Sequence, residues 1–271
     1  MALIREAMQK VFEIVSIGNE LLIGKVVNSN ASYLCKRITE LGGFVRRITV
    51  VRDDLEEISS SIREAISRNT DYIITTGGLG PTFDDMSLEG VAKAFNLELE
   101  INEEALQLVK EKYDKLNEPL TPHRIKMAKL PRGAKPLKNP IGTAPGVILE
   151  EGKTKIICLP GVPKEMEAIF EDSLKEIISK DITLKFLDMS LSVLNVKESN
   201  IAPIIDEVRK ELPEVYIKSH PKGYEGSPKI ELHLTVTGED AESMKMMLQK
   251  VAKLLEEKIE LIGGKVEKNL S

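Results

Sequence analysis

The sequence predicts an α/β protein with a doubly wound, mostly parallel sheet, followed by a second, smaller α+β domain. Two observations indicate this fold class. Strands and amphipathic helices alternate over residues 1–180, and glycine-rich turns follow the first and third strands. Such alternation requires right-handed crossovers and hence a parallel sheet covered on both faces. From about residue 181 the pattern changes, so we expect two domains, at 1–180 and 181–271.

Composition and charge exclude several classes of protein. The chain has 271 residues, 42% of them hydrophobic, and a formal charge of -5, which argues against a general nucleic-acid binder. Cys35 and Cys158 belong to no paired motif, so we expect neither zinc nor a disulfide. No apolar run is long enough to cross a membrane, and the N-terminus lacks a signal-peptide core. We therefore expect a cytoplasmic protein without nucleic-acid or membrane partners.

Hydrophobic periodicity predicts five elements before the second glycine turn. They are a strand at 12–17, a helix at 31–41, a strand at 44–51, a helix at 55–66 and a strand at 72–74. Asp54 and Glu57 predict a capping box at the start of the second helix. Ligands of open α/β sheets gather at the carboxyl ends of the strands, so the turns at 18–20 and 77–85 should lie there together.

The stretch T-T-G-G-L-G-P-T-F-D-D joins the third strand to a helix. Gly77, Gly78 and Gly80 allow a sharp turn, and bare amides near a helix start suit a phosphate. Asp84 or Asp85 sits where an N-cap belongs. Carboxylates repel phosphate unless a divalent cation lies between them, so the pair predicts a Mg²⁺-type site. The alternative is a capped helix after a tight turn, without a ligand.

The rest of the first domain contains a further run of helices and a hairpin. We expect helices from Asn102 to about Leu116 and from Thr121, a hairpin at 147–150 and 155–159, and a helix after Pro163. Glu165 lies in the first turn of the last helix, where a carboxylate also complements the helix dipole.

The second domain has a different order of elements. We expect a strand at 184–194, a helix at 199–212, strands at 215–219 and 229–237, and a helix at 240–259. Alternation along the 229–237 strand places His233 on the solvated face of a half-buried sheet. We interpret this unit as a structural or dimerising module.

Four ordered motifs resemble those of the CinA proteins, which belong to the MoaB/Mog-like molybdopterin-binding superfamily. They are G-N-E-L-L-I-G at 18–24 with Asn28 and Asn30, T-T-G-G-L-G-P-T-F-D-D at 75–85, G-T-A-P-G at 142–146 and L-P-G-V-P-K-E-M at 159–166. The resemblance covers essentially the whole chain and implies a Mog-like sheet domain followed by a KH-type domain. Full-length CinA proteins add a C-terminal amidase domain, which we do not expect in a chain ending at Ser271.

A literal G-x-x-G occurs at 223–226, as in the nucleic-acid clamp of KH domains. We do not interpret it as a clamp, because it lies between two expected strands and carries Glu225 in place of a basic residue.

The resemblance implies a metal-dependent nucleotide diphosphate hydrolase that acts on ADP-ribose or a related dinucleotide such as FAD and releases AMP. Asp84 or Asp85 would hold a Mg²⁺, Mn²⁺ or Co²⁺ ion, and Glu20 or Glu165 would orient the water or complete the metal shell. The general base is unassigned. By motif position, the substrate-binding residues are Gly18, Asn28, Asn30, Gly77, Gly78, Gly80, Thr82, Asn139, Gly142, Thr143 and Gly161.

Two other functions stay open. One is a molybdopterin-binding or adenylylating enzyme of cofactor biosynthesis, because one fold and one anion loop can host either chemistry. The other is a non-catalytic nucleotide-binding protein, which would bind through the glycines without needing both aspartates. Molybdopterin-side relatives usually carry Asp where this chain has Asn19, and the amide removes a possible metal ligand. Family likeness and exposed sheet edges also predict a homodimer.

Overall fold

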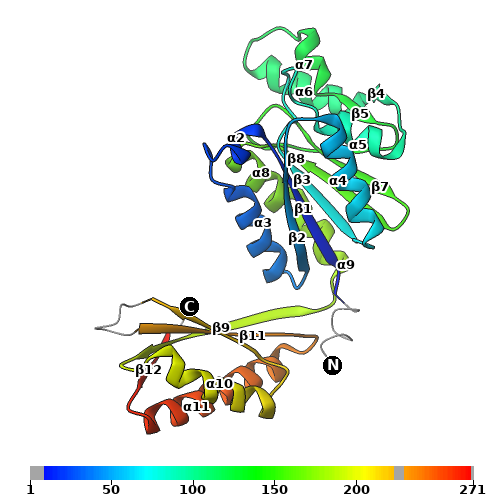
Figure 1. Ribbon diagram of the computed structural model, residues 1–271. Coiled ribbons are helices and arrows are strands. Elements are labelled where there is room, and N and C mark those ends of the chain that lie inside the picture. The colour runs from blue at the N-terminus through cyan, green and yellow to red at the C-terminus, as the bar shows by residue number, and fades with distance from the viewer. Residues whose placement is uncertain (1–8, 223–228, 270–271) are drawn as a thin grey trace. The chain divides into compact units, whose positions relative to one another are not determined.

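The computed structural model describes residues 9–222 and 229–269. They form two compact units (Figure 1): Gln9–Thr39 with Gly43–Ile182 make the larger one, and the smaller one begins at Thr183. The G-x-x-G stretch at 223–226 lies outside the described residues.

A six-stranded sheet forms the centre of the larger unit. Its strands are, in spatial order, β2 (Phe44–Val51), β1 (Val11–Ile17), β3 (Tyr72–Thr76), β8 (Thr154–Leu159), β7 (Gly146–Glu151) and β6 (Lys135–Leu137). The first four run parallel, and β7 and β6 are antiparallel to their neighbours. The chain leaves β1 to form β2 on one side and returns to form β3 on the other. The strand order therefore reverses between β1 and β3, which is where such sheets bind ligands.

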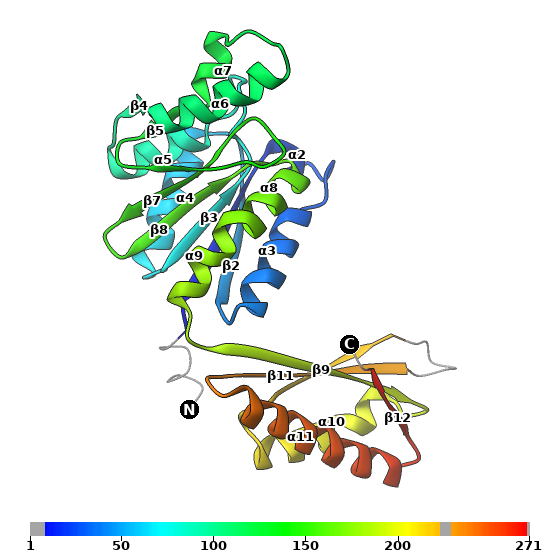
Figure 2. The same ribbon diagram turned by 180° about the vertical axis from the view of Figure 1, so that it is seen from behind.

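Helices cover both faces of this sheet, as expected for a doubly wound fold (Figures 1 and 2). One face carries α3 (Ser29–Glu40) and the run α8 (Pro163–Ile169), η1 (Phe170–Leu174) and α9 (Lys175–Asp181). The other carries α4 (Leu55–Ser67) and α5 (Ser87–Phe95). Because both faces are covered, every residue of β1 and β3 is buried.

The remaining elements of the larger unit lie in its connections. They are α2 (Asn19–Leu22), β4 (Leu99–Ile101), α6 (Glu103–Lys115), α7 (Pro122–Lys126) and β5 (Lys129–Pro131), with β4 and β5 forming a small antiparallel pair. The π-helical turn η1, which joins α8 to α9, was not expected from the sequence.

Most expected helix starts are confirmed. Asp54 caps α4 by accepting hydrogen bonds from two backbone amides, and Asn102 and Thr121 cap α6 and α7 in the same way. The capping box at α4 is not completed, because the Glu57 carboxylate accepts its hydrogen bonds from Arg52 instead.

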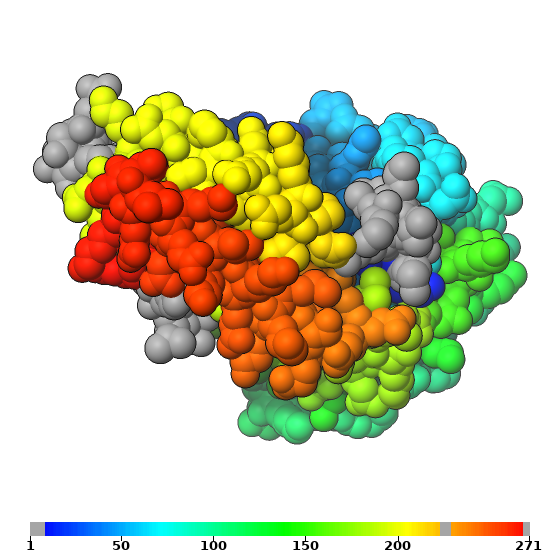
Figure 3. Space-filling model, turned by 90° about the horizontal axis from the view of Figure 1, so that it is seen from below, coloured from blue at the N-terminus to red at the C-terminus, as the bar shows by residue number. Residues whose placement is uncertain are grey.

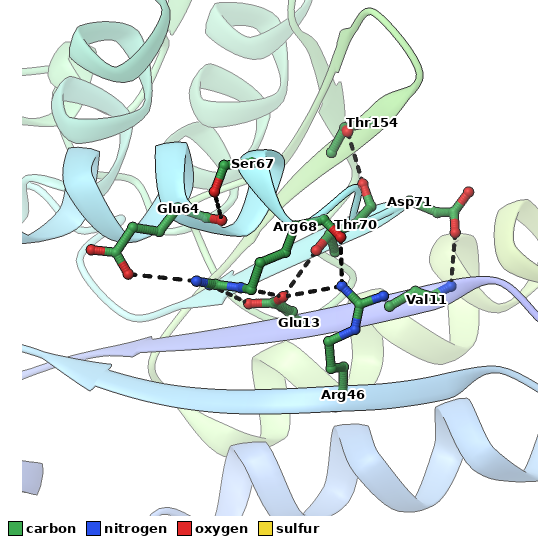
Figure 4. A network of polar contacts seen from close by, with 9 residues as sticks. All are labelled: Val11, Glu13, Arg46, Glu64, Ser67, Arg68, Thr70, Asp71 and Thr154. Carbon is green, nitrogen blue, oxygen red and sulfur yellow. Dashed lines mark hydrogen bonds and ion pairs between the residues drawn. The ribbon is translucent and has the colours of Figure 1, made fainter. Parts of the chain in front are cut away.

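A buried ion pair joins three elements at the amino ends of the central strands (Figure 4). Glu13 in β1 is 2% exposed and accepts two hydrogen bonds from Arg68, at 2.9 and 2.7 Å, and one from Thr70 at 3.0 Å. Arg68 follows α4 directly and Thr70 precedes β3. Burial alone would raise the pKa of Glu13, but these hydrogen bonds and the charges of Arg68 and Arg47 outweigh it and hold the pKa below its usual range.

The smaller unit is a four-stranded antiparallel sheet with two helices on one face (Figures 1 and 2). Its elements are β9 (Lys185–Leu194), α10 (Glu198–Glu211), β10 (Tyr216–Pro221), β11 (Lys229–Gly238), α11 (Ala241–Leu261) and β12 (Lys265–Asn269). The spatial order is β10-β11-β9-β12. Figure 3 shows the helical face of this unit, where α10 (yellow) and α11 (orange) lie side by side.

This topology differs from the expected KH-type unit. The order β-α-β-β-α-β is that of a ferredoxin-like split βαβ unit. Each helix of the unit lies between two strands, whereas the KH clamp joins two consecutive helices. The sequence analysis did not predict β12, which pairs with β9 and closes the second βαβ-like half. His233 lies in β11 with 39% of its side chain exposed, between buried leucines, as the alternation predicted.

No helix within the described residues is long and apolar enough to span a membrane.

Candidate functional site

A cavity of about 410 Å³ opens at the carboxyl edge of the sheet, where the strand order reverses. It is lined by residues that follow β1, β2, β3 and β8, together with part of the 139–146 loop. Five carboxylates line it: those of Glu20, Asp53, Asp84, Asp85 and Glu165. No Lys, Arg or His is among the described residues that form its wall. The site is therefore an anionic pocket at the position where open α/β sheets bind ligands.

The Asp84–Asp85 pair closes a turn and does not cap a helix. Helix α5 begins only at Ser87, with Met86 at the N-cap position and no side-chain cap. Asp85 accepts a hydrogen bond from the amide of Thr82 at 2.8 Å. The Thr82 hydroxyl lies 2.5 Å from both the Asp84 and the Asp85 carboxylates. The N-cap expectation was wrong because the side chains turn back on Thr82, which leaves them lining the cavity.

Asp53 is a pocket residue that the sequence analysis missed. Its carboxylate accepts a hydrogen bond from the backbone amide of Asn19 at 2.9 Å. Burial raises the pKa of Asp53, the Asn19 amide opposes this, and the charges of Glu20 and Asp84 raise it further, so that the pKa lies above its usual range. The available signal was its position just after β2, equivalent to that of Glu20 after β1.

The glycine turn needs Gly77 for backbone conformation and close approach. Its φ is +112°, and a Cβ there would overlap the carbonyl oxygen of Ile17 at the end of β1. The Gly77 amide donates to the carbonyl of Leu159 at 3.0 Å, so it holds strand ends together. The amides of Gly78 and Gly80 have no hydrogen-bond partner in the described part of the chain, and both residues line the cavity. These two amides are the ones free to bind an anion.

Three other predicted binding residues position loops. The Gly18 amide donates to the backbone of β2, and Asn28 pairs with a serine of β1 and caps the start of α3. Asn30 is buried and donates to the Thr76 hydroxyl at 2.8 Å and to the Gly161 carbonyl at 2.9 Å. Asn30 thereby ties the loop after β1 to the ends of β3 and β8. A smaller cavity, of about 80 Å³, is lined by residues that include Asn28, Asn30 and Gly161. Glu20 lines both this cavity and the main one.

On the opposite wall, Asn139 orients Glu165. Its side-chain oxygen accepts from the amides of Ile141 and Gly142, and its Nδ2 donates to Glu165 at 2.7 Å. A Cβ on Gly142 would overlap the Glu165 carboxylate, so only glycine leaves room for that contact. Thr143 lines the cavity beside Glu165. Asn139 is 3% exposed and acts through Glu165.

The donor set fits a hard divalent cation. Carboxylate oxygens are the ligands that Mg²⁺ and Mn²⁺ prefer. The Thr82 hydroxyl carries one proton and cannot satisfy both Asp84 and Asp85, so a cation beside the pair would offset the remaining charge. No group of three or more His, Cys, Asp or Glu side chains in the described ranges is placed to hold an ion by itself. A Mg²⁺ site needs only one or two carboxylates when substrate phosphates and waters complete its shell.

Comparison with known proteins agrees with this geometry. Residues 13–180, which comprise nearly all of the larger unit, match the model of a family described as a probable molybdopterin binding domain. The larger unit is therefore a molybdopterin-binding-type domain.

Relatives and a solved structure extend the comparison. A protein of Pyrobaculum arsenaticum is 48% identical over 90% of this chain and 92% of its own length. A protein of Sulfurisphaera tokodaii is 46% identical over 94% and 97%. A crystal structure described as the protein CinA with unknown function, from Thermoplasma acidophilum, has 47% identity and a TM-score of 0.59. It covers 62% of this chain and 98% of that chain. This chain belongs to the CinA/MoaB–Mog superfamily, as its motifs predicted.

Proposed function

We propose that the protein is a metal-dependent hydrolase of nucleotide diphosphates, acting on ADP-ribose or a related dinucleotide such as FAD and releasing AMP. One observation carries the proposal: five carboxylates and two unpaired glycine amides share a cavity that no cationic side chain of the described residues lines. One positive charge lies beside the turn, that of Lys126, whose ammonium donates to the carbonyl oxygens of Thr82 and Asp85. It does not balance five carboxylates, so a diphosphate approaching Gly78 and Gly80 would be repelled unless it arrived with a divalent cation. The cavity therefore favours a metal–diphosphate complex over a free anion.

Each residue has a role that its contacts support. The amides of Gly78 and Gly80 bind phosphate oxygens, and Asp84 and Asp85 hold the cation, which when bound supplies positive charge to the phosphates. Glu165, oriented by Asn139, faces the cavity from the opposite wall and is placed to accept a proton from the attacking water. Attack of this water on the phosphorus next to adenosine would form a new P–O bond and break the bond from that phosphorus to the bridging oxygen. The products are AMP and the second phosphate ester, which keeps the bridging oxygen.

A second candidate is an adenylylating or molybdopterin-binding enzyme of cofactor biosynthesis. It is favoured by the family match, whose description is a probable molybdopterin binding domain. The same amides and carboxylates would serve, because adenylyl transfer also takes place at a nucleotide phosphate held with a cation. The two candidates differ in what receives the adenylyl group: water or molybdopterin.

The test is product analysis with and without metal. The protein is incubated with ADP-ribose or FAD and with Mg²⁺, Mn²⁺, Co²⁺ or a chelator, and AMP is quantified by chromatography. We expect metal-dependent AMP release that Asp84→Asn lowers by about 100-fold or more. Asp114→Asn is the matched control, since Asp114 is an exposed aspartate of α6 outside the pocket.

Two results would count against the hydrolase. The first is no AMP with any metal while ADP-ribose still binds by calorimetry. The second is equal activity of Asp84→Asn and Asp114→Asn, which would place the chemistry elsewhere. Release of pyrophosphate from ATP only when molybdopterin is present would support the second candidate.

A further inference from the structure

A second cavity, of about 200 Å³, lies beside the acidic pocket and carries the opposite charge. Lys112 and Lys115 of α6 line it from one side, and Lys138, which follows β6, lines it from the other. Thr143 lines both this lysine cavity and the acidic pocket, so the two are adjacent. Both belong to the larger unit.

The positive charge of the lysine cavity is not balanced by its own wall. The Lys112 ammonium donates to the carbonyl oxygen of Pro140 at 2.8 Å, which is a neutral partner. Glu111 also lines the cavity and offsets one of the three positive charges, so the wall keeps an excess of positive charge. Within the described ranges, none of Lys112, Lys115 and Lys138 forms an ion pair.

The lysines also act on one another. Burial lowers the pKa of Lys112, the charges of Lys115 and Lys138 lower it further, and the charge of Glu165 acts in the opposite direction. Gathering like charges around one half-buried ammonium disfavours its charged form, and an anion placed among the three would reverse this. The protein thus balances the positive charge of the three lysines only in part, and the cavity is complementary to a negatively charged ligand.

We propose that the lysine cavity binds a phosphate monoester of the same nucleotide whose diphosphate occupies the acidic pocket. This proposal rests on the proposed function, which places the diphosphate of the nucleotide in the acidic pocket. Lysine is a common phosphate ligand, and a dianionic monoester needs no divalent cation in a cavity lined by three lysines and one carboxylate. The two cavities then sort the ligand by charge: the diphosphate binds with metal beside Asp84, and the monoester binds directly beside Lys138. The favoured substrates are dinucleotides with a phosphate beyond the diphosphate.

The experiment compares two dinucleotides that differ only in that phosphate. NAD and NADP share one diphosphate, and NADP adds a single 2′-phosphate monoester. Affinities are measured by calorimetry with Mg²⁺ for the unaltered chain, for Lys138→Met, and for Lys110→Met. Lys110 is an exposed lysine on α6 that lines neither cavity, and so provides the matched control.

We expect the unaltered chain and Lys110→Met to bind NADP about tenfold more tightly than NAD. A factor of this size is typical of one hydrogen bond between charged groups. Lys138→Met should remove this preference and leave the affinity for NAD unchanged. Inorganic phosphate, followed by phosphorus NMR without metal, should bind the unaltered chain more tightly than Lys138→Met. Circular dichroism checks that each variant is folded.

Equal affinity for NAD and NADP in the unaltered chain would overturn the inference, and so would a preference that survives Lys138→Met. Neither result bears on AMP release from ADP-ribose, which has no additional phosphate. Conversely, a lysine-dependent preference for NADP without any AMP release would support the phosphate subsite and contradict the hydrolase.

Discussion

Asp53 brings a carboxylate into the pocket next to the first motif of the chain, which has the neutral Asn19. Asn19 stands where molybdopterin-side relatives of the resembled family usually have an acid, and its side chain cannot supply a carboxylate. Its backbone amide instead holds the carboxylate of Asp53, which enters the pocket beside Glu20 and Asp84. The negative charge of the pocket is therefore kept by a residue from the next strand end.

The raised pKa of Asp53 gives a prediction at the scale of this residue. An acid whose folded-state pKa is raised destabilises the fold once it ionises above that pKa, so at neutral pH the charge of Asp53 is unfavourable without a cation. Asp53→Asn keeps a hydrogen-bond acceptor for Asn19 and removes the charge. We expect its Tm without metal to rise by about 1 °C or more at pH 7.

With Mg²⁺ and ADP-ribose the order should reverse, because the cation stabilises the unaltered pocket more than the variant. Thermal unfolding at pH 7 and pH 4, with and without the ligands, measures both effects. The gain should shrink toward pH 4, where the unaltered Asp53 is increasingly protonated. A variant that is less stable than the unaltered chain in the absence of metal would contradict this account.

At the scale of elements, Glu13 holds β1, the end of α4 and the start of β3 in register. The pair with Arg68 is bidentate, and Glu13 is only 2% exposed (Figure 4). It lies near the amino ends of the central strands, whereas the pocket lies at their carboxyl ends. Arg68 also contacts Glu64, at 3.5 Å, but Glu64 is 66% exposed. Arg68 thus forms one ion pair with a buried carboxylate and one with an exposed carboxylate. Comparing the two pairs shows how burial changes the contribution of an ion pair to stability.

We expect Glu13→Gln to lower the free energy of unfolding by about 3 kcal/mol, because it breaks a buried pair and leaves Arg68 with only the exposed carboxylate of Glu64. Glu64→Gln should change it by less than about 0.5 kcal/mol. Urea unfolding at pH 7 measures both. Because the folded-state pKa of Glu13 is depressed, its contribution is present above the unfolded-state pKa and is lost as the pH falls below about 4. Equal effects of the two variants at pH 7 would refute the role of burial.

At the scale of the whole molecule, the buried hydrophobic residues of the described ranges include two separate clusters. One lies between the six-stranded sheet and its helices, and the other lies between β9–β11 and the helices α10 and α11. No buried residue is shared by the two clusters. The candidate site is built entirely from the larger unit, so its ligand chemistry should not depend on the stability of the smaller one.

Leu232→Ala and Leu34→Ala test this independence. Both leucines are fully buried, the first in the core of the smaller unit and the second in α3 of the larger one. Each truncation should destabilise its own unit by about 2–5 kcal/mol. Calorimetry should show that Leu232→Ala lowers the midpoint temperature of one unfolding transition only. Mg²⁺ with ADP-ribose should raise the midpoint temperature of the other transition. If both variants shift every transition alike, the units unfold together and the prediction fails.

The sequence by itself determined most of the longer helices and strands, the doubly wound class and the family. Periodicity at 2 and 3.6 residues and the capping types Asp54, Asn102 and Thr121 are local signals, and local contacts satisfy them in the structure. The parallel topology followed from the connections, so the edge carrying Glu20 and the glycine turn was predictable before any contact was known.

Only the tertiary structure decided which side chains share the site. Asp53 has no motif of its own and enters the pocket because β2 lies beside β1. Gly77, Asn28 and Asn30, which were expected to bind ligand, also hold loops and strand ends together. The lysine cavity likewise joins α6 to the residue after β6, from segments that only the fold brings together. The physical reason is that hydrogen bonds and charge interactions depend on distances in space, and sequence patterns report only the neighbours along the chain.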